Sequence, residues 1–151
     1  MNHAVVAGAL AVAALNALPA LLGGWRWYRE EQSDTFWVLL RIGQGATVML
    51  AIAIGSLAVA GRYSSEHLFY LYALTPLAVA FLAEQLRVAS AQMILDQRGL
   101  VNSQAVGELP EAEQRELVGT IMRREMGVMT ASALVGVLLV LRAAATAHGF
   151  G

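Results

Sequence analysis

The stretch FLAEQLRVASAQMILDQR, residues 81–98, begins as a helix soluble in lipid and ends as a helix soluble in water. Neither Gly nor Pro interrupts it, so one continuous helix is predicted. Glu84 lies about one turn before Arg87 and on the same helical face. A carboxylate this close to hydrocarbon is costly unless a cation or a water-filled space meets it. The other arginine well inside an apolar segment is Arg41, so we predict that Arg41 and Glu84 pair and set the packing of a membrane bundle.

The composition is that of an integral membrane protein. The 151 residues are 58% hydrophobic and 14% charged, whereas soluble domains average about 25% charged residues. The net charge of -1 does not favour nucleic acid as a partner, and the expected partner is the lipid bilayer. Because Cys is absent, disulfides, thiolate catalysis and Cys-ligated metals are excluded. All ten basic residues are Arg, which we interpret as a sign of a GC-rich bacterial genome.

Four apolar runs predict an all-α, polytopic protein with a single domain at 1–151. The predicted spans are residues 4–23, 35–60, 67–88 and 126–145. The first run lacks the positively charged start and the clear cleavage site of a signal peptide, so we interpret it as a span that ends at Gly23 and Gly24. The spans are expected to form an antiparallel bundle. The third and fourth helices should extend past the bilayer as a helical hairpin at 89–124.

The distribution of arginines predicts the orientation. The loop between the first two spans and the 89–124 connection lie on one side of the membrane and carry most of them: Arg26, Arg29, Arg98, Arg115, Arg123 and Arg124, with Arg41 and Arg87 at the margins. The opposite side has Arg62, plus Arg142 near the end of the fourth span. The positive-inside rule therefore predicts a multi-pass plasma-membrane protein with both termini extracytoplasmic and the hairpin cytoplasmic.

A polar cluster near the cytoplasmic boundary is the candidate site. Its members are Arg41, Gln44, Glu84, Arg87 and Glu125, with Gln85 and Arg124 beside them. In a functional interpretation, they form a pocket in which Glu84 binds a proton or cation and Arg41 is its counter-charge. In a structural interpretation, they tie helices together and extend towards the interface. Both interpretations stay open.

The three histidines, His3, His67 and His148, are all expected on the outer face. Three imidazoles could bind zinc, copper or haem iron. Their spacing lacks any close ligand pair, and two lie near the ends of the sequence. Neither a metal site nor a cofactor is therefore predicted.

Catalytic motifs are not found in the sequence, so no catalytic residue is assigned and an enzyme is not indicated. The main hypothesis is a small, homo-oligomeric membrane protein that binds or conducts a small ion, proton or solute at the polar cluster. The alternative is an accessory or scaffold subunit whose hairpin contacts a larger membrane complex. A haem or metal redox protein is the third possibility.

Overall fold

A computed structural model describes residues 2–100 and 102–148. In this part of the chain the regular elements are helices: α1 (Asn2–Tyr28), α2 (Asp34–Val59), α3 (His67–Gln97), α4 (Ser103–Gly107) and α5 (Glu111–Thr146). All except the short α4 are long and apolar enough to cross a membrane. The predicted all-α class and its four candidate spans are confirmed.

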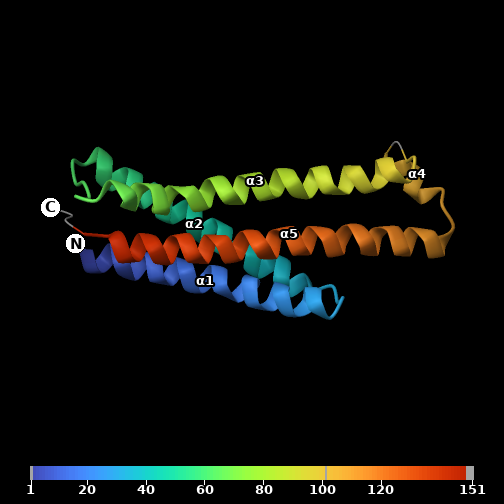
Figure 1. Cartoon of the computed structure of the whole chain (residues 1–151), viewed down its shortest axis with the longest axis horizontal. Helices are drawn as coiled ribbons and strands as arrows, with labels where there is room; N and C mark the ends of the chain where they lie inside the picture. The colour runs from blue at the N-terminus through green and yellow to red at the C-terminus, as the bar shows by residue number, and fades with distance from the viewer. Residues whose placement is uncertain (1, 101, 149–151) are drawn as a thin grey trace.

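The long helices lie side by side, and α5 occupies the centre of the arrangement (Figure 1). It packs extensively against both α1 and α3, while α2 packs mainly against α1 and contacts α3 much less closely. The two ends of the chain lie at one end of the molecule. At the opposite end α3 and α5 project beyond α1 and α2, and α4 lies in the connection between them.

The buried core divides into two clusters along the length of the molecule. One lies towards the chain ends and contains Val5, Ala9, Val12, Ala13, Leu50, Ile54, Phe69, Ala73, Val140, Ala143, Ala144 and Ala147. The other contains Phe36, Leu40, Ala83, Met126, Met129 and Ala133. Between these levels lie the buried polar residues Asn16 and Thr47. The apolar core is thus interrupted by a polar layer.

The first helix does not end at Gly23 and Gly24, and that prediction is wrong. Helix α1 continues through both glycines to Tyr28. A Cβ atom on Gly23 would collide with Thr130 of α5 and with the ring of Phe36 of α2. Glycine is needed here because three helices meet, and its helix-breaking tendency is overridden by their packing.

A serine side chain caps the start of α2 but not the start of α3. Ser33 caps α2, because its Oγ accepts a hydrogen bond from Phe36 N at 3.3 Å. Ser64 and Ser65, which precede α3 and are residue types that commonly cap helices, do not cap it. Both hydroxyls donate to the carbonyl oxygen of His148, and α3 begins after Glu66 without a side-chain cap. These two serines instead tie the loop after α2 to the end of α5.

Candidate functional site

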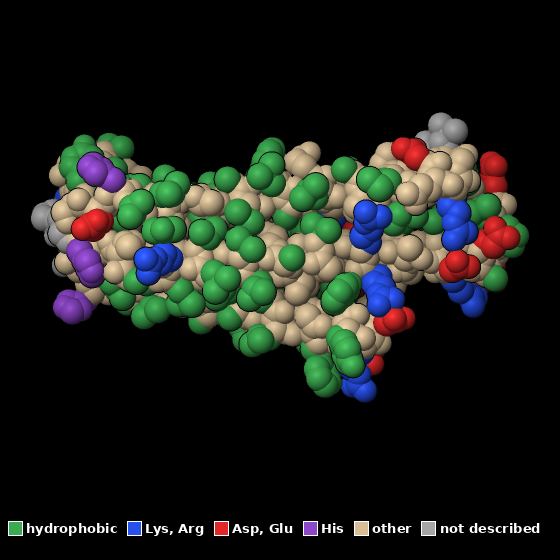
Figure 2. All heavy atoms as spheres, viewed as in Figure 1, with side chains coloured by type: hydrophobic (Ala, Val, Ile, Leu, Met, Phe, Trp, Pro, Cys, Tyr) green, Lys and Arg blue, Asp and Glu red, His purple; other side chains and the backbone are tan. Residues whose placement is uncertain are grey.

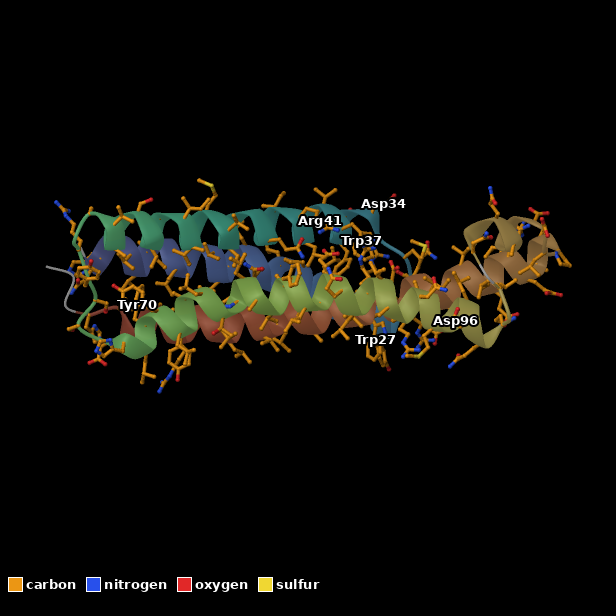
Figure 3. All side chains as sticks on the ribbon, turned by 90° about the horizontal axis from the view of Figure 1, so that it is seen from above. Trp27, Asp34, Trp37, Arg41, Tyr70 and Asp96 are labelled. Atoms are coloured by element: carbon orange, nitrogen blue, oxygen red, sulfur yellow. The ribbon has the colours of Figure 1, made fainter. Side chains whose placement is uncertain are left out.

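The predicted pair between α2 and α3 is present. Arg41 Nη1 lies 2.5 Å from Glu84 Oε1 and also donates to Gln44 Oε1 at 2.7 Å. Gln44 Nε2 in turn donates to Glu84 Oε1 at 3.2 Å. Arg41 and Gln44 are one turn apart on α2, so both reach the same carboxylate. Figure 3 shows Arg41 and Trp37 on the side of α2 that faces α3.

The network continues from α3 to α5 through Arg87. Its Nε lies 3.1 Å from Glu84 Oε2, and its Nη1 lies 3.3 Å from Glu125 Oε2. The guanidinium is also placed 5.8 Å from the centre of the Trp37 ring, within range of a cation–π interaction. Arg41, Glu84, Arg87 and Glu125 thus form a chain of alternating charge, here called the charged quartet, that joins α2, α3 and α5.

The quartet offers hydrogen-bond donors more readily than acceptors. Both carboxylate oxygens of Glu84 accept bonds from guanidinium groups, so a cation would have to displace an arginine. Arg41 makes its described contacts through Nη1, and 54% of its side-chain surface is exposed. Its Nε and Nη2 groups therefore remain available to an acceptor, and a planar fork of this kind suits a carboxylate or phosphate.

An apolar groove between α2 and α3 leads to the quartet. It has a volume of about 560 Å³ and is lined by Gln44, Thr47, Val48, Leu74, Leu77, Ala78, Ala80, Phe81 and Glu84. Gln44 and Glu84 form its polar end. The groove exists because α2 and α3 pack less closely than the other neighbouring helices. We call it the α2–α3 groove.

The space inside the bundle at this level is much smaller. A cavity of about 10 Å³ lies among Asn16, Leu40, Gln44, Thr47, Pro76, Ala80, Ser132, Ala133 and Gly136. That volume matches about one water molecule. Gln44, Thr47 and Ala80 line both spaces, so they form the wall between the interior and the groove.

The remaining predicted members lie outside the network. Gln85 is exposed, and Arg124 contacts the sulfur of Met93 at 3.9 Å. Sequence reasoning missed Trp37, which is half-buried and lies one turn before Arg41 on α2. That spacing was a signal, because an aromatic ring one turn from an arginine lies on the same helical face.

The histidines lie at the end of the molecule that carries the chain ends (Figure 2). Most acidic and basic side chains on the face shown lie towards the opposite end. Within residues 2–100 and 102–148, no group of three His, Asp or Glu side chains is placed to hold a metal ion. The structure therefore does not bring His3, His67 and His148 together as a ligand set.

No family model, no curated protein and no solved structure matches the chain.

Proposed function

We propose that the protein binds a small ion or solute at the charged quartet, where the α2–α3 groove ends. The observation that carries this proposal is the half-exposed Arg41 guanidinium, which has unused donors and bonds to Gln44 and Glu84, the two residues at the polar end of a groove of about 560 Å³. Small-molecule sites typically have volumes of ~300–1,000 Å³ and combine apolar walls with a few polar groups. The groove has both properties.

We propose that one chain binds the ion or solute. Conduction across the membrane would require more than one chain. The central cavity of about 10 Å³ does not provide a path for a hydrated ion. Four helices of one chain enclose too little space for a path, so a homo-oligomer is the form in which transport would occur. Neutralising Glu84 would then abolish ion-linked flux in liposomes.

The topology we propose is an antiparallel bundle in a plasma membrane, with both termini extracytoplasmic and the hairpin at 89–124 in the cytoplasm. Support comes from the arginine distribution and from the projection of α3 and α5 beyond the other helices (Figure 1). This orientation puts the quartet near the cytoplasmic headgroups, where water and soluble ligands reach Arg41.

A thermal-shift experiment tests the binding proposal. The purified chain, freed of lipid in detergent, is heated with a panel of soluble anions, cations and polar solutes. A ligand at about 100 times its Kd stabilises the native state by about 2.7 kcal/mol, so the wild-type Tm should rise measurably. Arg41→Gln should lose this rise.

Arg142→Gln is the matched control, because Arg142 lies over Tyr72, away from the quartet. It should keep the wild-type response. If no compound shifts the wild type, or if both variants lose the shift equally, the quartet is not a binding site for soluble ligands.

The second candidate function is an accessory or scaffold subunit. It is favoured by the projecting part of α3 and α5, where Arg98 pairs with Glu116 at 3.0 Å on an exposed surface. Purification in a gentle detergent from the native host separates the two candidates. A stoichiometric partner protein would favour the scaffold, and a homo-oligomer without partners would favour the binding protein.

A further inference from the structure

We propose that the α2–α3 groove is a binding site for an anionic phospholipid, with the phosphate on Arg41 and an acyl chain along the groove. This inference rests on the proposed binding function and names the class of ligand. It is carried by the position of Arg41, which bonds to Gln44 and Glu84 at the polar end of the groove, next to a mostly apolar wall.

The length of the groove matches one leaflet of a bilayer. On α3 its lining extends from Glu84 to Leu74, ten positions apart, or roughly 15 Å at the helical rise. The hydrocarbon core of a membrane is ~30 Å thick, so one leaflet is about half of that. An acyl chain whose head lies level with Arg41 would therefore follow the groove to about the middle of the bilayer.

The walls suit an acyl chain. Val48 from α2 and Leu74, Leu77 and Phe81 from α3 line the groove, and its volume of about 560 Å³ is open to the outside of the bundle. Leu50 and Phe69 belong to one buried cluster, and Leu40 and Ala83 belong to the other, so both α2 and α3 contribute to the core on the inner side of the groove.

The free hydrogen-bond donors beside the polar end of the groove suit an anion. Arg41 keeps Nε and Nη2 for an acceptor, while Glu84 is already neutralised by two guanidiniums. Arg124 adds a positive charge at this end of the spans, and its described contact is to a sulfur atom, not to a carboxylate. A phosphate accepts two parallel hydrogen bonds from such a fork. The cytoplasmic leaflet, in which we place this end, is the one that carries anionic lipids.

Lipid retention measured by native mass spectrometry tests the proposal. The purified full chain is incubated in detergent with phosphatidylglycerol or with phosphatidylcholine, and bound lipid is counted. The wild type should retain phosphatidylglycerol preferentially. Arg41→Gln should lower that retention roughly tenfold, the effect of one charge-assisted hydrogen bond. Arg41→Lys keeps the charge without the two-donor fork and should keep only part of the retention, whereas Arg142→Gln should keep all of it.

A second variant keeps the test valid if Arg41→Gln does not fold. Leu77→Trp fills the groove and leaves the quartet intact, so it should lower retention of phosphatidylglycerol. Leu71→Trp is its control, because Leu71 is exposed on the same helix and does not line the groove. Retention of both lipids to the same extent by the wild type, or equal effects of the two tryptophans, would overturn the proposal.

Two further outcomes also overturn it. One is disulfide cross-linking of Val48→Cys between two copies in native membranes, because a second chain would then occupy the groove. The other is a soluble solute that raises the Tm through Arg41 when phosphatidylglycerol is not retained. In that case the proposed binding function stands and the lipid assignment fails.

Discussion

Asn16 shows how one polar side chain fixes the distance between two membrane helices. Its Nδ2 donates to Val12 O at 2.9 Å on α1, and to Gly43 O at 3.2 Å and Thr47 Oγ1 at 3.1 Å on α2. The amide reaches the α2 backbone because residue 43 has no side chain. Polar bonds of this kind inside membrane proteins average about 0.6 kcal/mol each, so close packing of the backbones contributes beside them.

We therefore expect Gly43→Ala to destabilise the fold by about 1–3 kcal/mol, the usual cost of overpacking. The new Cβ would lie 2.9 Å from Asn16 Oδ1 and 3.2 Å from Leu15 O, and the backbone oxygen cannot move aside. Reversible unfolding in mixed detergent measures the change. Gly45→Ala, two residues away with open space around its Cβ, is the matched control and should be near neutral. Equal destabilisation by both would show that the contact with Asn16 is unimportant.

At the scale of elements, the quartet holds together two helices that otherwise pack weakly. Helices α2 and α3 have few other contacts along the groove, and Arg41–Glu84 bridges them at its end. Removing the charge of Glu84 leaves two arginines facing each other across the gap. Removing one partner of a partly buried ion pair destabilises a protein by more than the intact pair stabilises it.

Glu84→Gln should therefore let α2 and α3 move apart. Spin labels attached at the exposed positions Ile42→Cys on α2 and Leu82→Cys on α3 report the distance between the two helices by pulsed electron paramagnetic resonance. We expect a longer and broader distance distribution in the variant than in the wild type. Glu111→Gln is the control, because Glu111 pairs with Arg115 on a surface where both side chains are more than three-quarters exposed. An unchanged distribution in Glu84→Gln would mean that apolar packing alone holds the helices.

The sequence predicted the elements better than their ends or the spaces between them. Apolar runs and their length predict four spans, and the cost of isolated charges in lipid predicts the Arg41–Glu84 pair. The continuation of α1 past Gly23 could not be predicted, because it depends on Phe36 and Thr130 arriving from other helices. The α2–α3 groove was missed for the same reason, since periodicity says which residues share a face but not how closely two faces approach.

At the scale of the whole molecule, the charges are divided unequally between the two ends. The histidines lie at one end and most of the acidic and basic side chains on the face shown lie at the other, with few in between (Figure 2). Helices with this distribution present an apolar middle to lipid and two polar ends to water. The direction of insertion then depends on the arginines beside the spans, and this makes the proposed orientation testable.

Single cysteines can report that orientation, because the natural chain contains none and gives no background. Asn102→Cys lies beside α4 in the projecting connection, and Tyr63→Cys lies in the exposed loop after α2. In intact cells a membrane-impermeant maleimide should label position 63 and leave position 102 unlabelled until the membrane is permeabilised. The reverse pattern would place the hairpin outside the cell. Equal labelling of both in intact cells would contradict the two-sided arrangement itself, because α3 would then not cross the membrane.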